Sequence, residues 1–289
     1  MAKELSIAEQ LCYNTTRIET KNSAGEYHIA TGFFLAFDLT ENKKILPLLV
    51  TNRHVANNAN IMDICLTEKD EDDNPIDKNI IKIHIPNAKE NFIFHPDDNV
   101  DLAVIPIYSY ISKVEQQLNK KLYYKTFPSD MLINEVKASM LDAIEEVIMI
   151  GYPNALWDGT NNRPIFRYGI TATDPKIDYE NRREFMIDCA CIRGSSGSPV
   201  ILFYKGLFCN KFGKETHYDE TKLILLGIQY AIPLQTAEGK MEKIDTPTAV
   251  TEEIPVIGLP INLGYIIKGQ CLYDFIPLLE KKLNVKIKL

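Results

Sequence analysis

A serine, a histidine and an aspartate in this chain stand in contexts that suit nucleophilic catalysis. The serine lies in the segment GSSGSP at residues 194–199, a glycine-flanked turn between two apolar runs. Glycines allow backbone conformations that aim successive N–H groups into one concavity, which is what binding a tetrahedral oxyanion requires. Ser196 is placed to attack a carbonyl carbon, and the N–H groups of Gly194, Ser195 and Ser196 itself are the candidate oxyanion donors. Turns of this composition also occur as plain hairpins, so the segment alone does not identify an active site.

A serine hydroxyl is a weak nucleophile unless a base takes its proton, and a carboxylate must orient that base. Of the five histidines, His54 suits this role because it follows the apolar run at residues 45–51, whose end would hold the side chain rigidly. The other four histidines are interpreted as surface or structural residues. Asp101 suits the role of the carboxylate because it abuts the apolar run at residues 102–107, where it can be buried against a histidine. The acids just before it belong to a solvated loop.

Seven segments, those above among them, resemble the trypsin-like serine peptidases in their HtrA/Deg-type bacterial form. They are TGFF at 31–34, VTNRHVA at 50–56, DLAV at 101–104, VIMIGYP at 147–153, RYGI at 167–170, GSSGSP at 194–199 and GIQYAI at 227–232. The order histidine, aspartate, serine is that of this family and differs from the serine, acid, histidine order of the α/β-hydrolases. Each segment is a weak signal by itself, and their shared order carries the resemblance.

The resemblance implies a serine endopeptidase with His54, Asp101 and Ser196 as its catalytic triad. Ser196 would attack a peptide carbonyl and form an acyl-enzyme, His54 would shuttle the proton, and Asp101 would orient His54. The substrate would be a peptide or a protein. No PDZ module of the kind that many HtrA-type proteins carry is recognised after the second barrel.

By position in the family pattern, Ala190 lies at the base of the primary specificity pocket, where an aspartate would select Lys or Arg. Gln229, Tyr230 and Ala231 would line the substrate-binding walls. An uncharged pocket of this kind favours a small or medium apolar side chain before the scissile bond. The family also leads one to expect a small hydroxyl residue near Gln229 and Tyr230 that supports Asp101, and none is present.

The fold predicted from the strand pattern and the resemblance is all-β, with two six-stranded antiparallel β-barrels of the chymotrypsin type. Residues 1–125 would form the N-terminal barrel, which carries the histidine and the aspartate. Residues 126–289 would form the C-terminal barrel with the serine, the specificity pocket and a C-terminal helix at 270–283 packed on that barrel. The β-rich runs are 27–37, 45–51, 61–66, 80–85, 91–94 and 102–107, then 146–150, 165–173, 184–192, 199–204, 223–232 and 262–267.

The composition argues against some classes of binding partner. The 289 residues carry a formal charge of −7, with acidic and basic residues interspersed, which argues against a nucleic-acid or anionic-membrane partner. No apolar run is long enough for a membrane span, and the first ten residues lack the features of a signal peptide, so we expect a cytoplasmic protein. The six cysteines are then expected to be reduced. The spacing of Cys189 and Cys191 does not match a metal site, and nothing in the chain requires a metal or an organic cofactor.

Three interpretations of the function stay open. The chain is an active peptidase, or a catalytically inactive trypsin-like fold that binds or senses peptides. In the third, it is a latent peptidase whose turn at residues 193–195 is ordered only when an activating partner binds. The long segment at residues 203–222 is either a regulatory or substrate-docking element or a solvated decoration.

Overall fold

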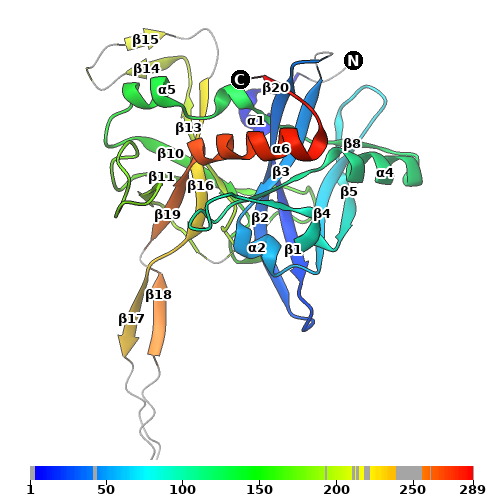
Figure 1. Cartoon of the computed structure of the whole chain (residues 1–289), viewed down its shortest axis with the longest axis horizontal. Helices are drawn as coiled ribbons and strands as arrows, with labels where there is room; N and C mark the ends of the chain where they lie inside the picture. Colours follow the sequence, from blue (N-terminus) through cyan, green and yellow to red (C-terminus); the bar gives the residue numbers. More distant parts are fainter. Residues whose placement is uncertain are drawn as a thin grey trace, which may run out of the picture.

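The computed structural model describes residues 4–41, 44–192, 194–209, 212, 215–217, 222–238, 256–260 and 262–288. Strands dominate the chain and form two β-structures that lie side by side (Figure 1). Short helices connect the strands. They are α1 (Ile7–Leu11), α2 (Arg53–Asn57), α3 (Ala88–Asn91), α4 (Tyr108–Leu118), η1 (Ser129–Met131), α5 (Glu135–Met140), η2 (Pro153–Ala155), η3 (Gly269–Phe275) and α6 (Ile276–Leu283).

The first β-structure, called the first sheet below, is a ten-stranded sheet with the main order β5-β4-β1-β2-β3-β7-β6. Three further short strands pair with it: β8 with β4, and both β9 and β20 with β2. The strands are β1 (Thr15–Lys21), β2 (Tyr27–Leu39), β3 (Ile45–Thr51), β4 (Ile61–Lys69), β5 (Pro75–Pro86), β6 (Ile93–Phe94), β7 (Ala103–Pro106), β8 (Lys121–Tyr123), β9 (Phe127–Pro128) and β20 (Ile287–Lys288). Each of the six runs predicted for this half overlaps a strand, but the sheet is larger than the six strands expected. The longest strand missed is β1, whose threonines and charged residues hide its alternation of buried and half-buried positions.

The second β-structure is a closed barrel with the order β10-β11-β12-β19-β16-β13. Its strands are β10 (Glu146–Gly151), β11 (Ile165–Thr171), β12 (Glu184–Asp188), β13 (Pro199–Tyr204), β16 (Lys222–Ala231) and β19 (Leu263–Lys268). They are the six strands predicted from the sequence for this half. Every neighbouring pair in the barrel whose register is given is antiparallel.

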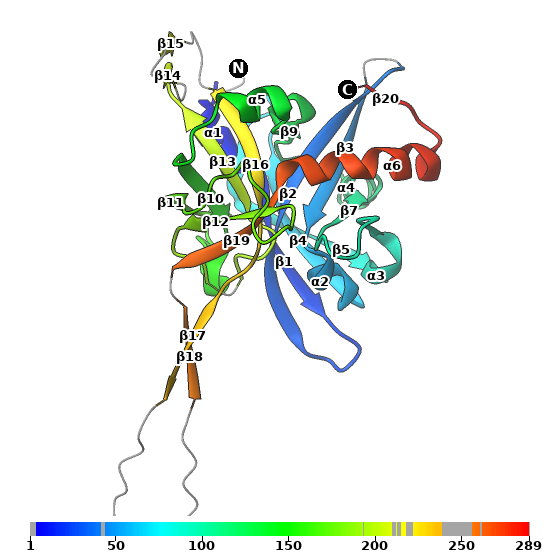
Figure 2. The same ribbon diagram turned by 60° about the vertical axis from the view of Figure 1, so that its left-hand side comes forward.

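Two small hairpins interrupt the barrel sequence. The strands β14 (Leu207–Cys209) and β15 (Glu215–His217) lie within the segment at residues 203–222, so part of that segment is a β-hairpin. The strands β17 (Leu234–Glu238) and β18 (Val256–Pro260) follow β16 and extend away from the barrel (Figure 2). The second hairpin was not predicted.

The C-terminal helix was predicted to pack on the second barrel, and this prediction was incomplete. The segment is a 3₁₀ helix, η3, followed by α6, with Pro277 in the first turn of α6. One hydrophobic cluster contains Phe275 and Leu279 from this segment, Phe37 and Leu48 from the first sheet, and Ile228 from the barrel. Buried apolar contact with both β-structures therefore fixes the C-terminal segment across their junction.

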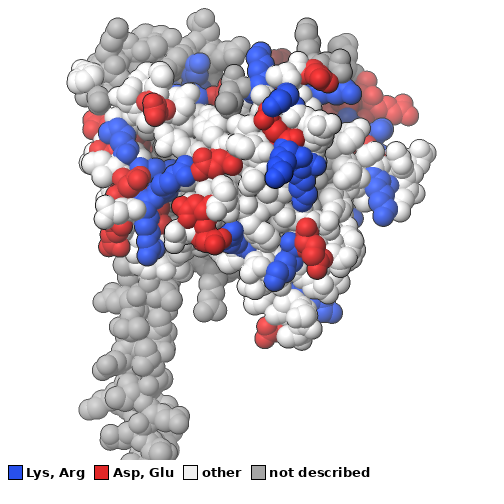
Figure 3. Space-filling model, viewed as in Figure 1, with Lys and Arg blue, Asp and Glu red and all other residues white. Residues whose placement is uncertain are grey.

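The surface carries mixed charge. On the face shown in Figure 3, acidic and basic side chains are interspersed. Within the described part of the chain, no helix is long and apolar enough to cross a membrane.

Candidate active site

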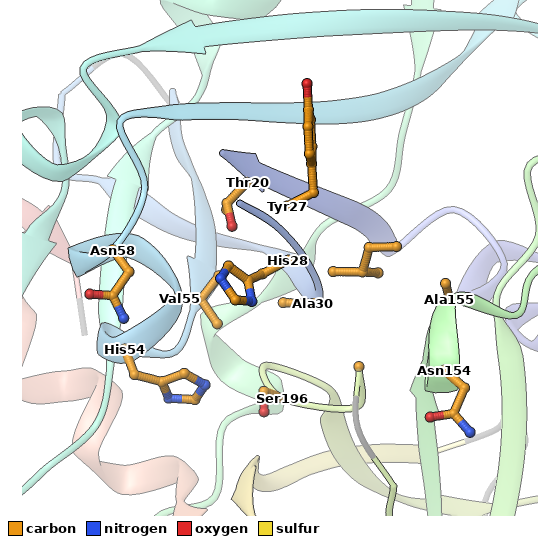
Figure 4. A pocket seen from close by; sticks show the side chains of 12 residues that line it. Thr20, Tyr27, His28, Ala30, His54, Val55, Asn58, Asn154, Ala155 and Ser196 are labelled. Carbon is orange, nitrogen blue, oxygen red and sulfur yellow. The ribbon is translucent and has the colours of Figure 1, made fainter. Parts of the chain in front are cut away.

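His54 and Ser196 line the same open pocket, which has a volume of about 500 Å³. Its walls come from the first sheet on one side and from η2 and the 194–196 turn on the other. Figure 4 shows His54 and His28 on one side and Asn154 on the opposite wall. The residues that line the pocket are Thr20, Tyr27, His28, Ile29, Ala30, His54, Val55, Asn58, Asn154, Ala155, Gly194 and Ser196.

His54 and Asp101 form a close pair. Strand β3 ends at Thr51 and helix α2 begins at Arg53, so His54 lies in the first turn of a short helix directly after a buried strand. The Nδ1 atom of His54 lies 2.5 Å from Oδ2 of Asp101, and the backbone N–H of His54 donates to Oδ1 of the same carboxylate at 2.8 Å. This two-point contact favours the tautomer with a proton on Nδ1, which leaves Nε2 free to act as a base.

The backbone of Asp101 is also held. Its carbonyl oxygen accepts the side-chain amide of Asn52 at 2.9 Å and the backbone N–H of Arg53 at 3.2 Å. Asp101 is thus held by three successive residues at the start of α2, its backbone by Asn52 and Arg53 and its carboxylate by His54. No hydroxyl group contacts it among the described residues, and the backbone N–H of His54 supplies the second hydrogen bond that the carboxylate needs.

A hydrogen bond and a glycine with positive φ hold the backbone just before Ser196. The N–H of Ser195 donates to the carbonyl of Ile192 at 3.1 Å, and Gly194 has φ +86°. A Cβ atom at Gly194 would lie 2.6 Å from the carbonyl oxygen of Tyr152, so only glycine fits there without rearrangement. Because the N–H of Ser195 already donates to the Ile192 carbonyl, it is not available to bind an oxyanion. Among the described residues, none accepts a hydrogen bond from the N–H of Gly194 or Ser196, which leaves these two as the candidate oxyanion donors.

The hydroxyl of Ser196 points to strand β16 of the barrel, which pairs with the strand that follows the serine. Its Oγ donates to the carbonyl of Tyr230 at 3.4 Å, while the ring of His54 points toward Ser196 (Figure 4). Within the described part of the chain, Ser196 Oγ has no hydrogen bond with His54. Rotation about the Cα–Cβ bond of Ser196 is the motion that would bring Oγ to Nε2, and such catalytic contacts are often long before substrate binds.

Of the four residues predicted to bind substrate, none lines the pocket with His54 and Ser196. Ala190 is exposed and Ala231 is half-buried. Gln229 is buried, and its side-chain amide donates to the carbonyl of Ala231 at 3.1 Å. It therefore packs inward and supports the strand instead of presenting a polar group to substrate.

Tyr230 carries the hydroxyl nearest in sequence to the position where the family pattern places a support for Asp101. This hydroxyl donates to Oε2 of the buried Glu184 at 2.5 Å, not to Asp101. Burial and the bond to Glu184 raise the pKa of the Tyr230 phenol. The contribution of Tyr230 to the site is its backbone carbonyl.

Sequence reasoning missed most of the pocket wall. His28, interpreted as a surface or structural residue, lies in the pocket with Tyr27 beside it on β2. Asn154 and Ala155 come from η2 and both have positive φ, of 47° and 62°. The sequence YPNA at residues 152–155 is a turn signal that could have pointed to this wall. Among the described residues, no group of three or more metal-ligating side chains is placed to hold a metal ion.

Comparison with known families decides the identity of the fold. The sequence model of the trypsin-like peptidase domain matches residues 30–208, which is more than half of the chain. The chain belongs to this family. The assignment confirms the predicted all-β double-barrel architecture with a C-terminal helix, and it makes the chain a serine peptidase, which is a hydrolase of peptides or proteins.

Three solved structures are similar to this trypsin-like peptidase. The HtrA-type protease AlgW with a tripeptide is 14% identical, with a TM-score of 0.45 that covers 95% of this chain and 62% of that one. The chain thus spans less than two thirds of the AlgW structure. The active form of the Rv3671c protease from M. tuberculosis is 13% identical, with a TM-score of 0.42, and the match covers 95% of this chain and 88% of that chain.

The thermostable serine protease AL20 from an extremophilic microorganism is 12% identical, with a TM-score of 0.44, and covers 92% of this chain and 96% of that chain. Similarity at this level carries neither substrate nor activity from those proteins to this one. The comparison with curated proteins gave no significant match.

Proposed function

We propose that this peptidase cleaves peptide bonds through an acyl-enzyme on Ser196, with His54 as the base and Asp101 as the carboxylate that orients it. The observation that carries the proposal is the two-point contact between Asp101 and His54, at 2.5 Å to the ring and 2.8 Å to the backbone N–H. Such a contact is needed to hold one tautomer and to stabilise the imidazolium that forms during proton transfer. It is also what a fold that only bound peptides would have no need to keep.

The proposed reaction follows from these positions. Ser196 Oγ leaves the carbonyl of Tyr230, gives its proton to Nε2 of His54 and bonds to the carbonyl carbon of the substrate. The N–H groups of Gly194 and Ser196 stabilise the oxyanion that develops. His54 then gives the proton to the leaving amine, and water hydrolyses the acyl-enzyme by the same route.

The two sides of the substrate are proposed to bind on different elements. The residue before the scissile bond, of small or medium apolar type, would lie toward Ala190 and Ala231. The open pocket bounded by Tyr27, His28 and Asn154 would take the residues after the bond, because His54 and Ser196 line it and neither Ala190 nor Ala231 does. None of the residues that line it is Lys, Arg, Asp or Glu.

A latent form is the second candidate, and one observation favours it. Ser196 Oγ is bonded to the carbonyl of Tyr230 and not to His54, so the nucleophile and the base are not yet joined. The latent interpretation assigns the change on activation to the turn at 193–195, and Arg193 of this turn lies outside the described residues. An activating partner would then act by turning the serine. A lag in cleavage of unfolded protein that a partner abolishes would support this form, and immediate activity of the purified chain would exclude it.

The experiment that tests the proposed function is labelling with a fluorescent fluorophosphonate, which reacts with activated serines. The wild type is expected to be labelled, and the Ser196→Ala and His54→Ala variants are expected to lose the label. Labelling that survives in both variants would contradict the triad. The cytoplasmic location, the lack of nucleic-acid and membrane partners, and the domain boundary between residues 125 and 126 stay predictions.

A further inference from the structure

Thr31, on β2 of the first sheet, bonds to the nucleophile turn of the barrel through both its hydroxyl and its backbone N–H. The residue is fully buried. Its hydroxyl donates to the carbonyl of Gly194 at 3.0 Å and accepts the backbone N–H of Tyr152 at 3.1 Å. Its backbone N–H donates to the carbonyl of Ser196 at 2.8 Å, and its carbonyl accepts the hydroxyl of Thr51 at 2.9 Å. One residue therefore joins both halves of the molecule at the site.

The two carbonyls that Thr31 binds belong to the residues whose N–H groups are the candidate oxyanion donors. The hydrogen bond to the Gly194 carbonyl fixes the peptide group between Gly194 and Ser195. The bond to the Ser196 carbonyl fixes the peptide group between Ser196 and Gly197. Glycine at residue 194 has little conformational preference of its own, so external contacts must hold the turn. The hydroxyl of Thr31 is the only side-chain group among the described residues that is shown to bond to the Gly194 carbonyl.

The packing around this contact leaves little room for adjustment. A Cβ atom at Gly197 would lie 2.0 Å from the carbonyl oxygen of Thr31, and one at Gly151 would lie 2.8 Å from its hydroxyl oxygen. The backbones of β2, β10 and the turn therefore meet directly around Thr31. Hydrogen bonds in such a dry contact are stronger than in water, and a partner left unpaired there is costly.

We propose that Thr31 is a positioning residue that holds the oxyanion hole of this peptidase from the opposite β-structure. The inference rests on the proposed function, because an oxyanion hole has a role only if Ser196 attacks a carbonyl. Thr31 touches neither the substrate nor the reacting atoms. It acts through the carbonyls of Gly194 and Ser196.

The Thr31→Val variant separates the hydroxyl from the shape of the side chain, since valine has nearly the same volume. Without the hydroxyl, the Gly194 carbonyl is no longer held and the Tyr152 N–H loses its acceptor. Oxyanion contacts strengthen in the transition state, so kcat is expected to fall by about 10- to 100-fold while KM changes little. Binding of a peptide aldehyde, whose adduct places an oxyanion in the hole, is expected to weaken by a similar factor.

Two further variants make the test specific. Thr31→Ser keeps the hydroxyl and is expected to retain kcat within about threefold. Thr16→Val is the matched control, because Thr16 is also fully buried and its hydroxyl both donates to the Cys65 carbonyl at 2.9 Å and accepts the Cys65 N–H at 3.1 Å. Thr16 pairs with Gly32, next to Thr31, but the two bonds of its hydroxyl to Cys65 stay within the first sheet. Thr16→Val is therefore expected to lower the thermal unfolding midpoint without lowering kcat.

The results separate this inference from the proposed function. Wild type that fluorophosphonate fails to label overturns both. Labelled wild type together with a Thr31→Val variant of unchanged kcat, or one that loses no more than Thr16→Val, overturns the role of Thr31 alone. A Thr31→Val variant whose KM rises as much as its kcat falls also overturns that role. Should Thr31→Val not fold, Thr31→Ala, which lacks the same hydroxyl, gives the same comparison.

Discussion

The proposed base and the proposed nucleophile of this peptidase are held in different ways. His54 and Asp101 lie in the same β-structure, and among the described residues the hydrogen bonds given for the aspartate all come from residues 52–54. Ser196 belongs to the other β-structure, and its own carbonyl and that of Gly194 are both bound by Thr31 from across the junction. The proposed base is thus positioned by residues next to it in the sequence, whereas the proposed nucleophile and oxyanion donors depend on how the two β-structures meet.

The largest effect is expected on the base side, from Asp101→Asn. An amide in place of the carboxylate would hold the ring of His54 in the wrong tautomer, and kcat is expected to fall by about 10⁴-fold. Steady-state hydrolysis of a peptide substrate measures it. Asp98→Asn is the control on the same loop, because the Asp98 side chain is 92% exposed and its ion pair with Arg53 lies at the surface. A change of no more than about twofold is expected for this control. Equal losses in the two variants would contradict the local pair.

The next effect is expected on the nucleophile side, from Gly194→Ala. The new Cβ would lie 2.6 Å from the Tyr152 carbonyl at a φ of +86°, so the turn must move and the oxyanion donors with it. A fall in kcat of about 10²-fold is expected. Gly206→Ala places the same change at a φ of 74° outside the site, where about 1 kcal/mol of unfolding free energy should be lost with kcat unchanged. Full activity of Gly194→Ala would mean that the turn contributes no donors.

The smallest effect on catalysis is expected from Tyr230→Phe, which removes the hydroxyl and keeps the carbonyl beside Ser196. The buried Glu184 loses its donor, so the free energy of unfolding should fall by about 1–3 kcal/mol while kcat stays within about threefold. Denaturant unfolding and steady-state kinetics measure both quantities. Tyr168→Phe is the control, since Tyr168 is 64% exposed and its hydroxyl also bonds to a glutamate, Glu146. Stability within about 0.5 kcal/mol of wild type is expected for it. A large loss of kcat in Tyr230→Phe would show that the hydroxyl takes part.

Much of the fold could be predicted because most of its strands can be recognised from their local sequence. The barrel strands are apolar or alternating runs bounded by turn residues, and all six were found. Strand β1 was missed because its pattern is built on threonine, and the hairpin of β17 and β18 because it lies outside the barrel. The size of the first sheet depends on pairings such as that of β20 with β2. This pairing joins residues about 250 positions apart, so no pattern in the local sequence predicts it.

The site shows the same division. His54 and Asp101 could be placed from their position beside apolar strands, and the structure brings them together. The inward direction of Gln229, the bond from Ser196 to the Tyr230 carbonyl and the position of His28 in the pocket depend on the packing of one β-structure against the other. Thr31 was recognised only as part of a motif, because the partners of its hydroxyl, Tyr152 and Gly194, lie 121 and 163 residues further along the chain.

The most direct test of the central claim is to locate the bond that a fluorophosphonate forms with the wild-type peptidase. Mass spectrometry of the digested adduct would distinguish Ser196 from its neighbours Ser195 and Ser198, whose hydroxyls are buried and have no hydrogen-bond partner among the described residues. The account predicts a single phosphonate on Ser196 that Asp101→Asn forms much more slowly. A phosphonate on Ser195 or Ser198, or equal rates in the wild type and Asp101→Asn, would contradict it.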